Sequence, residues 1–239
     1  MPQTDGPRVV RRKLTDGTVV EVLCAYTYIP LKRGARHCAD VFSQALSLAK
    51  MRRDLGEQFA HDVAGDLAAL VPENTELIAT PPAGRHSSAR GWYFTRELSI
   101  AVAQVAQVGL CRPLRWAVTG ADSMGKAIGS QAGHGRKLGR LAECVEDLAG
   151  RRVCIIDDVC TTGITITQAV EALRTVGAEV VGTVALARTE RTEDRPENER
   201  ARLKQRRGRP KRGRPASTTG PDDIGPVESS RKGTPDGRD

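Results

Sequence analysis

The chain has 239 residues, a formal net charge of +8, six cysteines and 3% aromatic residues. This length can bury one sizeable core with additional tails. No apolar run approaches the roughly 20 residues that span a bilayer, and residues 1–13 lack the apolar stretch of a secretory signal. No cysteines form a Cys-x-x-Cys pair or a zinc-type spacing with histidine. We therefore expect a reduced, cytoplasmic protein with free thiols and no membrane partner.

The positive charge is concentrated in one short segment. Residues 199–215 hold nine Lys or Arg and one acidic residue, and nine minus one equals the whole net charge of +8. The rest of the chain is therefore balanced. Any argument for a nucleic-acid partner applies to this segment alone.

The first part of the chain predicts a hairpin followed by helices. Two β-prone runs, 9–14 and 19–23, flank Asp16-Gly17, which is a hairpin signal. This hairpin is expected to form either a hood over the main sheet or its edge. Residues 26–34 are expected to be a connection, and apolar residues at helical spacing predict helices over 39–50 and 55–70.

The second part predicts strands that alternate with helices. Short strands are expected over 76–80 and 115–118, and a helix is expected over 96–108. Further on, a buried strand, a helix and a second buried strand follow one another, over 153–156, 166–176 and 180–186. This order is typical of a right-handed crossover in a parallel sheet.

Two further segments do not predict regular structure. Residues 119–139 contain six glycines and few apolar residues, which indicates either an active-site lid or a disordered loop. Residues 189–239 have too few large apolar side chains to offset the entropy of ordering, so they are predicted to be disordered.

The central strand leads into the most informative stretch. Asp157 and Asp158 follow the apolar run, where the strand is expected to end, and a hydroxyl-rich loop with Gly163 leads into the next helix. In open α/β sheets, ligands bind beyond the carboxyl ends of the strands. The N–H groups that open a helix have no partners within it, so they attract anions. The stretch predicts a phosphate site beside two carboxylates, with a capping pair at a strand end as the alternative.

A second anion loop is predicted after the strand over 76–80. That strand runs into Pro81-Pro82-Ala83-Gly84-Arg85, where glycine permits close backbone approach and arginine brings charge. Trp92, Tyr93 and Phe94 are expected to form a hydrophobic anchor beneath this loop. Lys126 and Arg136 would bring further charge from the lid, with solvated loop charges as the alternative.

The stretch 153–165 resembles the phosphoribosyl-pyrophosphate (PRPP) binding motif of the type I phosphoribosyltransferases. The resemblance is carried by Asp157, Asp158, Thr161, Thr162, Gly163 and Thr165. It implies an α/β fold with a mostly parallel sheet flanked by helices, a small N-terminal hairpin or hood and a disordered C-terminal tail.

The same resemblance implies a role for each part of the site. Asp157 and Asp158 would be the catalytic residues at the ribose hydroxyls, and they would also hold Mg²⁺ through water or PRPP. The pyrophosphate would meet Pro82, Ala83, Gly84 and Arg85, with Lys126 and Arg136 arriving from the lid. The 5-phosphate would be held by Cys160, Thr161, Thr162, Gly163, Ile164 and Thr165.

The wider chain, over about residues 40–188, is similar to the ComF branch, the competence-associated phosphoribosyltransferases. The matching segments are Ala49-Lys50-Met51-Arg52, Pro81-Pro82-Ala83-Gly84-Arg85, Arg90-Gly91-Trp92, Gln131 with Arg136, and Leu186-Ala187-Arg188. The chain departs from that branch in two places. It lacks the N-terminal zinc-type cysteines, and Tyr93 stands where an asparagine is usual.

The basic segment resembles a tandem AT-hook. Arg-Gly-Arg-Pro occurs twice, and the implied DNA-binding residues are Arg207, Gly208, Arg209, Pro210, Arg212, Gly213, Arg214 and Pro215. A narrow A·T-rich minor groove has a strong negative potential that attracts inserted arginines. The alternative is a solubilising, low-complexity basic tail.

These inferences predict three regions: an N-terminal hairpin or hood over 1–38, a phosphoribosyltransferase domain over 39–188, and a disordered tail over 189–239 with AT-hook-like repeats at 206–215. The predicted function is Mg²⁺-dependent, ComF-like phosphoribosyl transfer from PRPP, associated with A/T-rich duplex DNA through the tail. One alternative is a non-catalytic PRPP sensor associated with DNA, and another is an accessory protein in DNA uptake or processing. The acceptor is not predicted, and a homodimer is left open.

Overall fold

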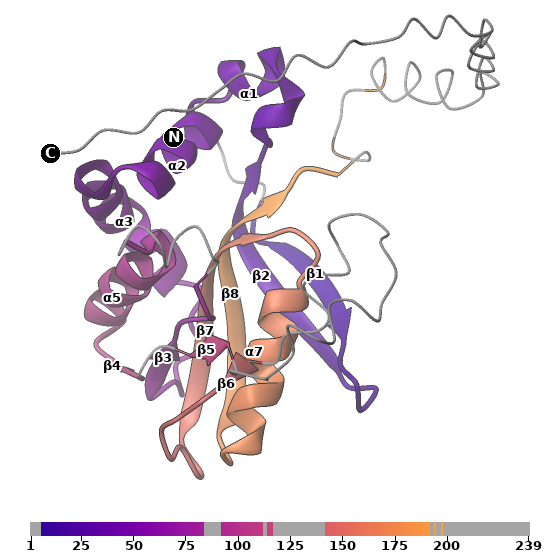
Figure 1. The fold of residues 1–239 in the computed structure, drawn as a ribbon, viewed down its shortest axis with the longest axis vertical. Coiled ribbons are helices and arrows are strands. Elements are labelled where there is room, and N and C mark those ends of the chain that lie inside the picture. The colour runs from indigo at the N-terminus through magenta and orange to yellow at the C-terminus, as the bar shows by residue number, and fades with distance from the viewer. Residues whose placement is uncertain are drawn as a thin grey trace, which may run out of the picture. The chain divides into compact units, whose positions relative to one another are not determined.

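The computed structural model describes residues 6–83, 92–111, 114–116, 142–191, 194 and 197. The chain divides into two units, Met1–Asp194 and Arg195–Asp239. Of the second unit only Glu197 is described, so the elements below belong to the first (Figure 1). The predicted lid over 119–139 and the AT-hook-like repeats lie outside the described residues.

A six-stranded sheet forms the centre of the first unit, with the strand order β1-β2-β8-β7-β3-β4. Every neighbouring pair is parallel except β1 with β2. This confirms the predicted α/β architecture with a mostly parallel sheet. The strands are β1 Arg8–Lys13, β2 Val19–Tyr28, β3 Leu77–Ala79, β4 Gly109–Leu110, β7 Arg152–Cys160 and β8 Glu179–Thr189. A separate antiparallel pair joins β5 Arg115–Trp116 to β6 Ala142–Glu143.

The N-terminal hairpin is an edge of the main sheet. Its turn is closed by a 2.8 Å hydrogen bond from the Thr18 N–H to Asp16 Oδ1, and Gly17 has a φ of +86°. The expected connection over 26–34 was partly wrong, because β2 continues to Tyr28 by pairing with the end of β8. This parallel pairing joins the hairpin to the sheet. Of the two predicted possibilities, the hairpin is therefore an edge of the sheet and not a hood over it.

The central strand β7 is longer than its apolar run. It was expected to end at Ile156, but it continues through both aspartates to Cys160. The extension arises because Asp157, Val159 and Cys160 pair with residues of β8. Strand β8 likewise extends to Thr189, beyond its expected end.

The helices cover the two faces of the sheet unequally (Figure 1). Helices α2, α3 and α5 pack on one face, where they share a core with Cys154 and Ile156 of β7. Helix α7 packs on the other face, with Val153 and Ile155. The remaining two helices of the described residues, η1 and α1, are short. The bounds of the helices are η1 Leu31–Arg33, α1 Ala35–Ala39, α2 Val41–Met51, α3 Arg53–Ala68, α5 Phe94–Ala106 and α7 Ile164–Thr175.

The structure bears on two expectations, namely free thiols and no membrane-spanning helix. All six cysteines are free thiols, as predicted. Among the helices in the described part of the chain, none combines the length and apolar character that crossing a bilayer requires.

Candidate active site

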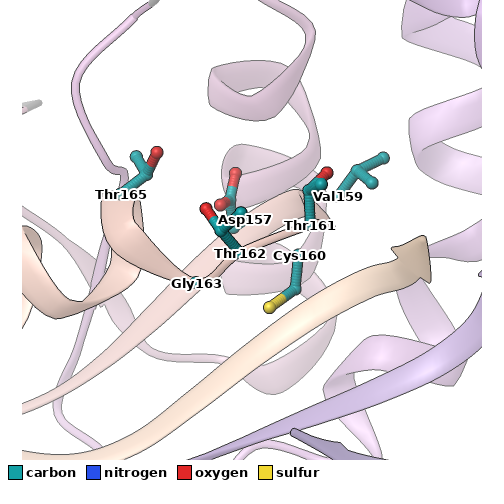
Figure 2. Close-up of a pocket in the computed structure, with 7 residues that line it drawn as sticks. All are labelled: Asp157, Val159, Cys160, Thr161, Thr162, Gly163 and Thr165. Carbon is teal, nitrogen blue, oxygen red and sulfur yellow. The ribbon is translucent and has the colours of Figure 1, made fainter. Parts of the chain in front are cut away.

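A pocket lies where β7 bends into α7, at the carboxyl end of the central strand (Figure 2). Gly163 is the N-cap of α7 and has a φ of +73°, a conformation that favours glycine. No side chain caps the helix there, so the first-turn N–H groups are available to an anion. The lining residues are Asp157, Val159, Cys160, Thr161, Thr162, Gly163 and Thr165.

Asp157 forms part of the pocket wall. Its side chain is only 7% exposed, and its Oδ1 accepts a 2.8 Å hydrogen bond from the N–H of Asp158. That bond orients the carboxylate at the end of the strand. Since carboxylates accept hydrogen bonds from hydroxyls and bind hard cations, Asp157 suits a sugar hydroxyl or a hydrated metal ion.

Asp158 lies on the opposite face of the sheet and is held by two other elements. Its Oδ2 is 2.9 Å from Lys50 Nζ, at the end of α2, and accepts a 2.9 Å hydrogen bond from Thr95 Oγ1, at the start of α5. Burial alone would raise the pKa of Asp158. The charge and hydrogen bond of Lys50, with the Thr95 hydroxyl, outweigh burial and lower that pKa.

Lys50 is a site residue to which the sequence reasoning gave no role. Burial would lower its pKa, but the charge and hydrogen bond of Asp158 reverse the direction and raise it. The available signal was the Ala49-Lys50-Met51-Arg52 segment, which carries the ComF resemblance. For Thr95 no local signal existed, since a threonine in the first turn of a helix is ordinary.

Cys160 turns its sulfur away from the loop hydroxyls (Figure 2). The thiol is buried and forms a hydrogen bond with Cys24 of β2, which lowers the pKa of Cys160 and raises that of Cys24. Any phosphate contact by Cys160 would therefore come from its backbone. The hydroxyl of Thr161 is 2.8 Å from that of Thr189, which ties the loop to the end of β8.

The start of the predicted pyrophosphate loop is held by two aromatic side chains. The Tyr93 hydroxyl donates a 3.1 Å hydrogen bond to the Pro81 carbonyl, and Trp116 Nε1 donates one of 2.9 Å to the Ala83 carbonyl. Trp92 is buried against Gly56, where an added Cβ would lie 2.4 Å from the indole ring. Phe94 is also buried, and both side chains belong to the hydrophobic core; most of the loop that they were expected to anchor lies outside the described residues.

Several predicted site residues cannot be placed in the structure. Pro82 and Ala83 are described, and both lie after β3. The others fall outside the described residues: Gly84, Arg85, Lys126, Arg136 and all eight predicted DNA-binding residues between 207 and 215.

The donors around the pocket fit a metal ion that depends on its substrate. Among the described residues, no group of three or more His, Cys, Asp or Glu side chains could hold a metal. Of the two carboxylates only Asp157 lines the pocket, and Asp158 pairs with Lys50 on the opposite face of the sheet. Mg²⁺ keeps several waters and commonly uses substrate phosphates as ligands, so one or two carboxylates suffice for it.

Comparison with known families gives a match in the second half of the chain. The family described as "Phosphoribosyl transferase domain" matches residues 121–210, a span that includes β7, the pocket loop, α7 and β8. Residues 121–210 are thus similar to a phosphoribosyl transferase domain. The predicted enzyme class, phosphoribosyltransferase, is thereby confirmed, and the ComF-like branch stays a prediction.

Solved phosphoribosyltransferases align with the chain only weakly. The adenine phosphoribosyltransferase of Thermoanaerobacter pseudethanolicus is 17% identical, with a TM-score of 0.38 over 59% of this chain and 72% of that one. The orotate phosphoribosyltransferase of Aeropyrum pernix is 16% identical, with a TM-score of 0.34 over 83% and 82%. TM-scores this low support no conclusion. No curated protein gives a significant match.

Proposed function

We propose that this phosphoribosyltransferase binds PRPP in the pocket at the end of β7 and transfers its phosphoribosyl group to a nucleophile with release of pyrophosphate. The observation that carries the proposal is the pocket itself. It joins the buried carboxylate of Asp157 to an uncapped helix N-terminus within a phosphoribosyl transferase domain. This combination suits a sugar that carries a phosphate.

In the proposed reaction, the bond between C1 of the ribose and the pyrophosphate oxygen breaks and a bond from C1 to the acceptor forms. The loop over 160–165 would hold the 5-phosphate through N–H groups and hydroxyls. Asp157 would accept hydrogen bonds from the ribose hydroxyls, with Asp158 held ionised behind it by Lys50. The protein would act mainly by positioning the reactants and stabilising charge as it develops.

The leaving pyrophosphate would be met by Pro82, Ala83, Gly84 and Arg85. The hydrogen bonds from Tyr93 and Trp116 support this role, because they fix the backbone where that loop begins. Lys126 and Arg136 would add positive charge from the lid. Mg²⁺, held by the PRPP oxygens and by Asp157 through water, would neutralise part of the phosphate charge.

Calorimetry with PRPP and Mg²⁺, followed by pyrophosphate release with candidate bases, tests this function. Binding with turnover supports the transferase, and the ComF-like branch would then be tested by the acceptor it uses. Binding without turnover on any acceptor would favour the PRPP sensor. If PRPP does not bind, both ideas fail. If the doubly substituted Asp157→Asn, Asp158→Asn protein keeps its biological activity, the domain serves only as a scaffold for an accessory role.

A second function, association with A/T-rich duplex DNA, is favoured by the repeated Arg-Gly-Arg-Pro of residues 207–210 and 212–215. Deleting 199–215 should abolish retention of duplex DNA at low salt. Replacing Arg207, Arg209, Arg212 and Arg214 with glutamine should remove the preference for A·T-rich duplex.

The control for the DNA experiment must separate groove recognition from bulk charge. Replacing Arg200 and Arg202 with glutamine removes charge from the same segment but leaves both repeats intact. This control should weaken binding to all duplexes alike and keep the A·T preference. Equal binding of A·T-rich duplex by the deleted chain would refute the AT-hook interpretation.

A further inference from the structure

Arg12 places a positive charge on the buried face of β1. Val10 and Leu14, two residues to either side, are both buried in the core beside α7. Because side chains alternate along a strand, Arg12 shares that face with them. Arginine is seldom placed on an inward face unless it has a partner there.

The side chain of Arg12 lies directly against the pocket loop. A Cβ built on Gly163 would lie 2.7 Å from both Cγ and Nε of Arg12, and 2.9 Å from its Cδ. Gly163 is the N-cap of α7, so the arginine stem packs on the residue where that helix begins. The charge of Arg12 also reaches Cys160: after the hydrogen bond from Cys24, it is among the influences that lower the pKa of Cys160.

The guanidinium group is incompletely paired at this position. Nη1 donates a 3.0 Å hydrogen bond to the carbonyl of Arg11, but Nε is buried and makes no hydrogen bond. Among the ion pairs of the described residues, none includes Arg12.

The position is also electrostatically unfavourable without a ligand. The N-terminal end of a helix carries partial positive charge, so a cation beside it is repelled. A buried donor without an acceptor adds a further cost. A single phosphate in the loop would offset the repulsion, because its oxygens would accept from the guanidinium and from the first-turn N–H groups together.

We infer that Arg12 is a 5-phosphate-binding residue, contributed to the pocket by the N-terminal hairpin. The inference rests on the proposed function and deepens it. The phosphate site is then built from two parts of the chain, the loop over 160–165 and strand β1. The hairpin edge of the sheet thereby becomes part of the binding site.

The test compares Arg12→Met with Arg11→Met in the full-length chain. Methionine keeps an apolar stem against Gly163 but removes the charge and Nε. Arg11 is an exposed neighbour that pairs with Glu21 at 2.8 Å, so its replacement removes the same charge outside the pocket. Binding of ribose 5-phosphate and of PRPP with Mg²⁺ would be measured by calorimetry, and thermal midpoints would be measured without ligand.

Arg12→Met should weaken ribose 5-phosphate binding about 10- to 100-fold, the usual effect of losing a hydrogen bond to a charged group. Arg11→Met should bind like the wild type, and Arg12→Lys should recover part of the loss. Without ligand, the midpoint of Arg12→Met should equal or exceed that of the wild type, because an unfavourable charge has been removed.

Three results would overturn the inference. If the wild type binds PRPP and Arg12→Met binds both ligands equally well, the proposed function stands and the role of Arg12 is refuted. A lowered ligand-free midpoint with unchanged affinity would likewise show that Arg12 is only structural. If the wild type binds neither ligand, the proposed function itself fails, and the inference fails with it.

Discussion

The two faces of the sheet differ sharply at the end of β7. On the face of α2 and α5, the Oδ2 atom of Asp158 contacts both a cation and a hydroxyl. On the face of α7, Asp157 borders a pocket with an uncapped helix N-terminus and the unpaired Nε of Arg12 nearby. Two adjacent carboxylates thus have different surroundings because a strand sends consecutive side chains to opposite faces.

This difference indicates that Asp157 and Asp158 have different roles. The side chain of Asp158 is 14% exposed, and its contacts tie α2, α5 and β7 together. It is better suited to holding the site in place than to moving with a ligand. Asp157 lines the pocket in which the substrate is proposed to bind. We therefore predict that Asp157 contacts the substrate and that Asp158 holds the site in place.

The largest effect is expected from Asp157→Asn. We expect pyrophosphate release to fall by about 100-fold or more, the loss typical of a group that stabilises the transition state, with little change in the thermal midpoint. Steady-state kinetics with PRPP would measure the fall. If Asp157→Asn keeps its activity while Asp158→Asn loses it without unfolding, the roles predicted for the two acids are reversed.

Gly163→Ala should lower the stability of the protein through both backbone strain and a steric clash. The φ of +73° costs an alanine roughly 1–2 kcal/mol, and the new Cβ would meet the side chain of Arg12. We expect the free energy of unfolding to fall by about 1–3 kcal/mol, with weaker ribose 5-phosphate binding. Urea denaturation would measure the change, and adding Arg12→Ala should restore part of the stability.

Gly65→Ala provides the matched control for that substitution. Gly65 lies within α3, and nothing approaches its added Cβ within 4 Å. Replacing an unhindered helical glycine with alanine should stabilise the protein by up to about 1 kcal/mol. If the two alanine variants lose stability equally, the conformation of Gly163 is not the cause.

A smaller loss of stability is expected on the face of α2 and α5, where Lys50 pairs with Asp158. Lys50→Met and Asp158→Asn should each lower the free energy of unfolding by about 1–2 kcal/mol, a modest loss because the Lys50 side chain is 39% exposed. The double variant should lose less than the sum of the two, since each single change already breaks the pair. Chemical denaturation of all four proteins would measure this coupling. Strictly additive losses would show that the pair does not stabilise the fold.

The smallest effect is the pH dependence of that pair. The lowered pKa of Asp158 stabilises the fold above its ordinary value of 3.8, and this contribution is lost as pH falls further. The raised pKa of Lys50 stabilises the fold below 10.5, and this contribution is lost as pH rises through the folded value. The thermal midpoint of the wild type should therefore exceed that of the double variant by a constant amount between about pH 5 and 9. A gap that instead widens below pH 3.8 would contradict the assignment.

Patterns confined to neighbouring residues were sufficient to predict the hairpin at Asp16-Gly17 and the β7–loop–α7 unit, and the structure has a pocket at that loop. Each depends on local chemistry: turn residues, an apolar run, or hydroxyls before a helix. The ends of β2 and β7 could not be predicted in the same way, because pairing with β8 extends both strands beyond their own patterns.

The sequence by itself determined that two carboxylates stand beside a hydroxyl-rich loop that leads into a helix. Only the tertiary structure decided what surrounds each of them. Lys50 reaches Asp158, and Arg12 reaches Gly163, across long separations in the chain. The alternation of β1, which puts Arg12 on a buried face, was the one local sign of the second contact. Such contacts depend on which strands become neighbours in the sheet, and no local pattern of residues specifies that order.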